Sequence, residues 1–149
     1  MRIAKDFTLV DQNGKTFNLY DNLTQPIMIV FYPKDESTVC TKQLCSYSNE
    51  YSKFTEAGLK IVGINIEDEI SHKNFAGRFG LRFPLLSDKD KSVSKAYDAL
   101  NIAGFNKRKI VIISTDKKIV YEHTSFPAFY EKSDAILDLL SKNKYLKMT

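Results

Sequence analysis

Apolar runs alternate with amphipathic stretches along this chain, and the alternation predicts its secondary structure. Three largely apolar runs, rich in isoleucine and valine, are typical of buried strands and span residues 27–32, 59–66 and 109–113. A fourth strand is expected at 118–122, joined to the third through Thr115-Asp116-Lys117. Near the N-terminus, Asn13-Gly14 lies between the short runs 7–9 and 16–19, which predicts a β-hairpin.

Four helical segments fill the space between these strands, at 38–57, 71–79, 91–100 and 133–141. Gly58 and Gly80 follow the first two segments, where glycine commonly ends a helix. The last segment is amphipathic, with several large apolar side chains available for the core: Ile136, Leu137, Leu139 and Leu140. Because strands alternate with helices early and a strand pair precedes the last helix, we expect an α/β fold with a mixed central sheet flanked by helices.

Composition and charge are those of an ordinary globular protein. The 149 residues have the length of one domain, 1–149, which can bury a core without disulfides or metal ions. The net charge of +4 comes from lysines spread along the chain, whereas a nucleic-acid surface usually clusters basic residues with aromatics. We therefore expect no nucleic-acid partner. We expect no membrane span either, because no apolar run approaches the ~20 residues that cross a bilayer.

The cysteine content gives the first indication of chemistry. Residues 1–6 lack the apolar segment of a signal peptide, which favours the cytoplasm. In that compartment two cysteines, Cys40 and Cys45, are more typical of catalysis than of a structural disulfide. We expect no metal and no cofactor, because His72 and His123 have no metal-ligand spacing to the cysteines and no glycine-rich phosphate loop is present. The carboxylates next to the first cysteine are expected to be solvated: Asp35 and Glu36.

Cys40 lies in the sequence context of a reactive thiol. The run 27–32 feeds a loop that contains Pro33, and the helix predicted from residue 38 begins just before the cysteine. Unpaired N–H groups and a partial positive charge at a helix N-terminus stabilise a thiolate, which is the nucleophilic form. We expect Ser37 to supply a hydroxyl close to the sulfur. Pro33 is expected to shape the pocket wall, because its φ is fixed and it has no N–H donor.

The loop itself lacks a well-oriented positive charge. Lys34 has a flexible side chain, so an arginine from another strand would serve better. Arg108 precedes the run 109–113, and the alternation of side chains along a strand places it on the same face as Ile110 and Ile112. The spacing leaves a second interpretation open, in which Arg108 is a surface cation. Its place at the beginning of a strand indicates that replacing it costs little stability.

The spacing between the two cysteines constrains what they can do together. In one regular helix, residues five apart have Cα atoms roughly 8.6 Å apart on different faces. A disulfide rarely exceeds about 6.8 Å between Cα atoms, so the pair bonds only if the helix unwinds. Cys40 and Cys45 would then form a reversible redox disulfide rather than a permanent structural one. The alternative, equally open, is that Cys45 is a small buried apolar residue.

With these residues in view, the chain resembles the peroxiredoxins (AhpC/TSA-like proteins), in particular the bacterioferritin comigratory protein or peroxiredoxin Q group, over nearly its whole length. The family pattern Pro-x-x-x-Thr/Ser-x-x-Cys is matched by Pro33, Ser37 and Cys40. A second cysteine five residues later is typical of the subgroup, and Cys45 fits it. The segment 83–88, which reads Phe-Pro-Leu-Leu-Ser-Asp, and an arginine that opens a strand, here Arg108, are similar to the family as well.

The resemblance implies a thioredoxin-like fold with an N-terminal β-hairpin extension and a thiol-dependent peroxidase that reduces hydrogen peroxide or organic hydroperoxides. It implies that the Cys40 thiolate becomes a sulfenic acid while Arg108 and Ser37 hold the peroxide oxygens. It also implies a Cys40–Cys45 disulfide, which thioredoxin or a similar dithiol reduces. No metal, flavin or haem is implied, and the subgroup is often monomeric.

The chain departs from the subgroup near these residues. Ser37-Thr38-Val39 replaces the common Thr-Pro-Gly, and Lys109 follows the arginine where a small polar residue is usual, which indicates a divergent member. Two rival functions remain to be weighed. A thiol-disulfide oxidoreductase on the same fold predicts a Cys-x-x-Cys pair, which is absent. A non-enzymatic redox-sensing binding module predicts an activity that does not depend on Cys40.

Overall fold

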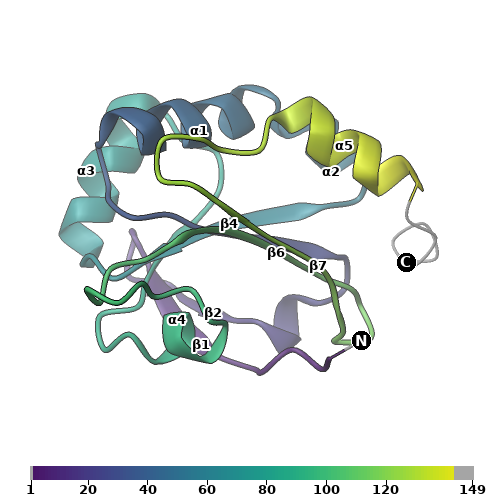
Figure 1. The fold of residues 1–149 in the computed structure, drawn as a ribbon, viewed down its shortest axis with the longest axis horizontal. Helices are drawn as coiled ribbons and strands as arrows, with labels where there is room; N and C mark the ends of the chain where they lie inside the picture. The colour runs from purple at the N-terminus through teal and green to yellow at the C-terminus, as the bar shows by residue number, and fades with distance from the viewer. Residues whose placement is uncertain (1, 143–149) are drawn as a thin grey trace.

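A seven-stranded mixed sheet runs through residues 2–142, the part of the chain that the computed structural model describes (Figure 1). The strands lie in the order β2-β1-β5-β4-β3-β6-β7. Their bounds are β1 Thr8–Asp11, β2 Thr16–Asn18, β3 Ile27–Phe31, β4 Lys60–Asn65, β5 Leu85–Ser87, β6 Arg108–Ile113 and β7 Ile119–Ser125. The three central strands β3, β4 and β5 are parallel, and the remaining pairings are antiparallel. The mixed central sheet expected from the sequence is therefore confirmed.

Helices cover both faces of this sheet, as Figure 1 shows. Their bounds are α1 Thr38–Asn49, α2 Tyr51–Glu56, α3 Glu69–Phe79, α4 Ser92–Ala96 and α5 Ser133–Lys142, with a short 3-10 helix at Tyr20–Asn22. The first three and α5 pack on one face, whereas α4 lies on the other. No helix among residues 2–142 is long and apolar enough to span a bilayer.

The central strand β3 divides the core into two halves, one on each face of the sheet. All five of its residues are buried. Met28 and Val30 join a cluster that includes Cys40 and the inner sides of α1, α3 and α5, while Ile27 and Ile29 join the cluster under α4. This is the period-2 alternation of a strand covered on both faces. Cys40 therefore belongs to the core half beneath α1.

Three elements differ from the sequence-based expectation. The helix expected at 38–57 is two helices that meet at Glu50, because the segment before the break is rich in serine and asparagine, whose side chains compete for backbone hydrogen bonds. The helix expected at 91–100 is short, since Asp98 takes a positive φ of 51° and ends it. The strand β5 was not expected, because its three residues are too few to show a period.

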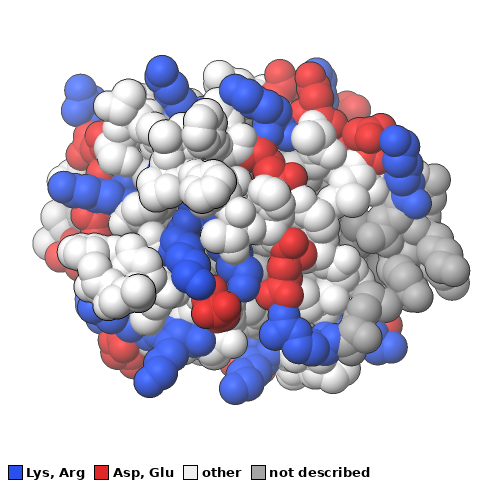
Figure 2. Space-filling view, in the orientation of Figure 1, with Lys and Arg blue, Asp and Glu red and all other residues white. Residues whose placement is uncertain are grey.

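Charge is mixed over the surface. On the face drawn in Figure 2, lysine and arginine side chains alternate with aspartate and glutamate, without a large region of one sign. Several of these charges form exposed pairs, such as Lys89 with Glu69 and Lys142 with Asp138. This distribution fits the solvated surface expected from the spread of lysines along the sequence.

Candidate active site

Cys40 is the third residue of α1 and has no exposed surface. The helix begins where the extended backbone of Ser37 ends, and the Thr41 N–H donates to the Ser37 carbonyl at 2.8 Å. The N–H groups of residues 38–40 precede this bond, so they have no partner within the helix. They leave a partial positive charge around the sulfur.

The Arg108 guanidinium supplies the full positive charge that the loop lacks. Its Nη2 donates to Cys40 Sγ at 3.3 Å, and only 5% of the residue is exposed. β6 positions it: the register pairs Phe31 with Lys109 and Val30 with Ile110, so Arg108 lies beside the point where the chain leaves β3. The interpretation of Arg108 as a surface cation is therefore wrong.

The other nitrogens of Arg108 are held as well. Nη1 donates to Gln43 Oε1 at 2.7 Å, and Nε donates to the Pro127 carbonyl at 3.2 Å. Because three hydrogen bonds fix the planar fork, its orientation towards the sulfur is set before any substrate binds. The expectation that replacing Arg108 costs little stability assumed a strand entry with little core to support, whereas the removal of Arg108 would leave Oε1 of the fully buried Gln43 without this donor.

A hydrogen-bonded chain extends from Arg108 to the C-terminal part of the fold. Gln43 Nε2 lies 3.2 Å from the Tyr47 hydroxyl, which donates to the Glu131 carbonyl at 2.7 Å. Burial raises the pKa of Tyr47 well above its ordinary value, so the phenol stays neutral. Sequence reasoning missed Gln43 and Tyr47. Their spacing from Cys40, three and seven residues along one helix, was the available signal, because it places all three on one side of α1.

The structure places the two remaining loop residues differently from each other. Pro33 lines a cavity of about 380 Å³ next to Arg108, so it forms part of the pocket wall as expected. The Ser37 hydroxyl donates to the Lys34 carbonyl at 3.3 Å, and no hydrogen bond joins it to Cys40 among the described residues. Its expected role towards a substrate at the sulfur stays a prediction.

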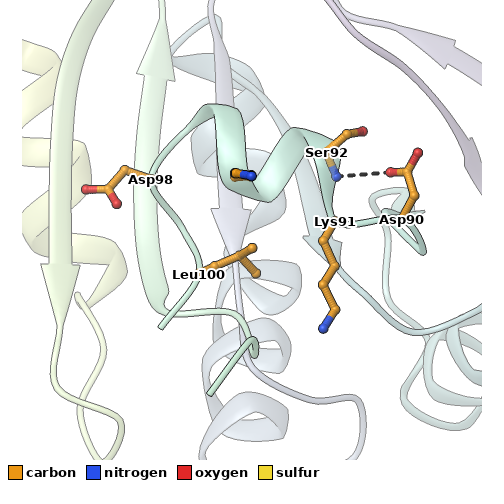
Figure 3. Close-up of a pocket in the computed structure, with 6 residues that line it drawn as sticks. Asp90, Lys91, Ser92, Asp98 and Leu100 are labelled. Carbon is orange, nitrogen blue, oxygen red and sulfur yellow. Dashed lines mark hydrogen bonds between the residues drawn. The ribbon is translucent and has the colours of Figure 1, made fainter. Parts of the chain in front are cut away.

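The cavity beside Arg108 has largely apolar walls. Apart from Pro33, the apolar contribution comes from Phe105, Phe126 and Pro127, on the segments that precede β6 and follow β7. A larger cavity, of about 680 Å³, lies around α4 and is drawn in Figure 3. Its lining is mostly charged, Asp90 and Lys91 among it, and it belongs to the opposite face of the sheet from Cys40.

Cys45 lies in the same helix as Cys40, and both are free thiols. Cys45 is half-buried, and this burial raises the pKa of its thiol. With both residues in regular α1, their Cα atoms are separated by roughly 8.6 Å, beyond disulfide reach. Bond formation between them therefore requires α1 to unwind.

Asp35 is not solvated, contrary to the sequence-based expectation. Its side chain is 2% exposed and accepts hydrogen bonds from side chains of several elements. The donors are the Tyr32 hydroxyl, Asn65 Nδ2 at 3.2 Å, the Ser71 hydroxyl at 2.7 Å and His72 Nδ1 at 2.6 Å. The signal for this cluster was topological: the loops after β3 and β4 emerge at one edge, because the two strands are adjacent and parallel.

Taken together, the site is a buried thiol held by an oriented cation at the mouth of an apolar cavity. A thiolate in this position can attack an electrophile that approaches beside the guanidinium, which would stabilise negative charge that develops there. Among residues 2–142, no cluster of three or more His, Cys, Asp and Glu side chains is arranged to hold a metal ion.

Comparison with known proteins gives a consistent result. The model of the AhpC/TSA family matches residues 2–122. Peroxiredoxin Q of Populus jackii, a chloroplastic protein, is 45% identical over 91 residues, which cover 61% of this chain and 43% of that protein. Its counterpart in Arabidopsis thaliana is 46% identical over 92 residues, 62% of this chain and 43% of that protein. The chain thus matches less than half the length of these relatives.

Solved structures match the fold over nearly all of the chain. Peroxidoxin BcpB from Mycobacterium tuberculosis superposes with a TM-score of 0.84 at 28% identity, covering 94% of each chain. The Xanthomonas campestris bacterioferritin comigratory protein, described for its alkyl peroxide reduction activity, gives a TM-score of 0.82 at 26% identity and covers 91% of this chain and 90% of its own. The thioredoxin-like fold expected from the resemblance is therefore confirmed.

Proposed function

Because the chain belongs to the AhpC/TSA family, we propose that it is a thiol-dependent peroxidase in which Cys40 is the nucleophile. One observation carries the proposal: the Arg108 guanidinium lies 3.3 Å from the sulfur of a fully buried cysteine at a helix N-terminus. The reacting group that suits this geometry is a neutral O–O group, which can approach the buried sulfur while the remainder of the molecule lies outside.

In the proposed reaction, Cys40 S⁻ attacks the nearer oxygen of the peroxide and the O–O bond breaks. The sulfur becomes a sulfenic acid, and the departing oxygen takes a proton to leave as water or an alcohol. Arg108 stabilises the charge on that oxygen as the bond breaks. Cys45 then attacks the sulfenic sulfur, releasing water and forming an intramolecular disulfide. An external dithiol, on thioredoxin or a similar protein, then reduces this disulfide by two electrons and restores both thiols.

The apolar cavity supports organic hydroperoxides as substrates alongside hydrogen peroxide. Phe126 lines the cavity and is largely exposed, while Phe129 is also exposed but is not part of the lining. Phe126→Ser should lower kcat/KM for an aromatic or long-chain hydroperoxide several-fold, because it removes apolar area from the wall. Its rate with hydrogen peroxide should stay near that of the wild type. Phe129→Ser is the matched control, and equal effects of the two substitutions would contradict a role for the cavity.

The primary experiment is a pair of cysteine variants mixed with a slight excess of hydrogen peroxide. Cys45→Ser should accumulate a sulfenic acid on Cys40, detected by mass after trapping with a 1,3-diketone, while Cys40→Ser should consume no peroxide. Rapid peroxide consumption by Cys40→Ser would contradict the assignment of Cys40 as the nucleophile. Adding a thioredoxin system to the wild type separates the peroxidase from the rival oxidoreductase and binding module, since only a peroxidase turns over peroxide.

The cytoplasmic location and the monomeric state stay predictions, to be tested by cell fractionation and by gel filtration.

A further inference from the structure

Asp35 ties the loop between β3 and α1 to three other parts of the fold. The loop covers residues 32–37 and carries Pro33 at one end and Ser37 at the other. The Asp35 carboxylate accepts from Asn65 at the end of β4 and from Ser71 and His72 in the first turns of α3. Its backbone N–H donates to Glu67. These four hydrogen bonds to residues outside the loop hold the loop in position.

His72 extends this attachment to β5. The ring has no exposed surface, and its Nε2 lies 3.1 Å from the Leu86 carbonyl. A carbonyl oxygen only accepts, so Nε2 carries a proton. Because Nδ1 faces Asp35 Oδ2 at 2.6 Å, one further proton lies between the two atoms. The pair is thus a rigid bridge from the loop to the sheet.

The residue after Asp35 is held in an unfavourable conformation. Glu36 has a φ of 58°, in the left-handed region that non-glycine residues seldom occupy. Its own side chain pairs with Arg78 Nη1 at 3.0 Å, but both side chains are exposed and such pairs contribute little. The buried neighbour Asp35 is therefore the group that offsets the strain at Glu36.

The bridge also reaches Cys40. Tyr32, whose hydroxyl donates to Asp35, is fully buried in the same core cluster as Cys40. Pro33, two residues before Asp35, lies beside Arg108 in the cavity wall. A displacement of Asp35 therefore moves the wall of the pocket and the beginning of α1 together.

We propose that Asp35 and His72 are positioning residues for Cys40: the hydrogen-bonded pair holds the loop against α3 and β5 in the conformation that places the thiol beside Arg108. Stability alone is a poor reason for the pair. Burying a carboxylate and an imidazole is expensive, and well-packed apolar side chains often serve a core equally well. Placement of the loop explains the pair better. Hydrogen bonds are directional, so they fix the loop in one orientation, which an apolar contact does not do. The inference rests on the proposed peroxidase function.

The test compares two substitutions of His72 that each keep a different hydrogen bond. The amide nitrogen of Asn occupies roughly the place of Nδ1 and can still donate to Asp35, whereas that of Gln occupies the place of Nε2 and can donate only to Leu86. In a Cys45→Ser background, the rate constant for Cys40 oxidation by hydrogen peroxide is measured in a single turnover. His72→Gln should slow it roughly tenfold, as expected for a displaced reacting group. His72→Asn should restore most of the rate, although both variants lose the ring and are destabilised alike.

A matched control is Asp88→Asn, which alters a buried carboxylate that accepts from the Val93 and Ser94 N–H groups and has no contact with the loop. It should lower the melting temperature and leave the rate unchanged. Should His72→Gln fail to fold, Ser71→Ala removes a second donor from the same Asp35 oxygen and should slow the rate in the same direction. Equal rates for His72→Gln and His72→Asn, or an unchanged rate in Ser71→Ala, would overturn the inference. A background protein that does not react with peroxide at all contradicts the proposed function instead.

Discussion

At the residue scale, Arg108 combines two roles that are usually separated. It directs a positive charge at Cys40, and it donates to the buried Gln43 and to the Pro127 carbonyl. A lysine at this position keeps the charge, but its donors lie on one nitrogen and lack the planar fork that reaches all three partners. Position 108 is therefore sensitive to shape as well as to charge.

We expect Arg108→Lys to slow the oxidation of Cys40 by peroxide on the order of a hundredfold, because the oriented donor to the transition state is lost. We also expect a fall of about 1–3 kcal/mol in the free energy of unfolding, since buried acceptors are left without donors. Stopped-flow oxidation and denaturant unfolding measure the two effects. A variant with normal stability but a slow rate would show that the hydrogen bonds to Gln43 and Pro127 carry no net energy.

The residues of the site differ in how far sequence reasoning found them. Strand alternation was enough to place Arg108 on the face of Ile110 and Ile112. These two isoleucines lie in the same core cluster as Cys40. The surroundings of Asp35 were not found, because a charged residue in a loop is normally solvated and only the neighbouring strand and helix reveal its partners. Local patterns identify which face a side chain takes, but they do not identify what it meets across the fold.

At the element scale, α1 holds both cysteines in a geometry that excludes a disulfide. Oxidation must therefore exchange helical hydrogen bonds for a covalent bond. Leu44 lies between the cysteines and is fully buried, so it has to leave the core when the segment unwinds. In the proposed cycle, reduction would let the helix reform, so we expect a Cys40–Cys45 disulfide to be readily reducible.

We expect amide hydrogen exchange to become faster over residues 38–47 when the protein is oxidised, while β6 remains protected in both redox states. The Cys45→Ser variant, treated with peroxide in the same way, is the control, because it loses its thiol chemistry without forming the disulfide and should keep α1 protected. Equal protection in the reduced and oxidised protein, with the intramolecular disulfide verified by mass, would contradict unwinding.

Whole elements were predicted more reliably than their ends. Long apolar runs identified β3, β4 and β6, and Asn13-Gly14 identified the hairpin, in which Gly14 takes a φ of 77°. The short strand β5 was not predicted, because it depends on pairing with distant segments rather than on a local period. The break at Glu50 was not predicted either, because serine and asparagine weaken a helix without marking the residue at which it ends. β5 is held by its pairing with β4 on one side and β1 on the other.

At the scale of the whole molecule, the buried carboxylate of Asp35 and the partly buried carboxylate of Glu67 give opposite pH dependence to stability. Burial alone raises the pKa of Asp35, but hydrogen bonds from His72, Tyr32 and Ser71 lower it below its ordinary value. Its contribution is present above the unfolded value of about 3.9 and is lost as the pH falls through the folded value. Burial raises the pKa of Glu67, so its contribution is present below about 4.3 and is lost as the pH rises through the folded value.

We therefore expect Glu67→Gln to stabilise the protein at neutral pH, with little change in strongly acidic solution. A single oxygen of Glu67 accepts from both the Asp35 N–H and Asn65 Nδ2, so the amide oxygen of glutamine can keep both bonds while the buried charge disappears. Melting temperatures measured from pH 3 to pH 8 check this, with Glu69→Gln on the exposed side of α3 as the control. A lower melting temperature for Glu67→Gln at pH 7 would show that the charge itself holds the Asp35 loop.

The complete burial of Cys40 also sets the order in which the protein meets other molecules. While α1 is intact, the buried sulfur is expected to be closed to glutathione disulfide, to bulky alkylating reagents and to other proteins. In the proposed cycle, a protein reductant would gain access to the sulfurs only after oxidation has opened the helix. The reduced protein would thereby be shielded from adventitious thiolation, and the reductant would be spared encounters with molecules that have no disulfide to repair.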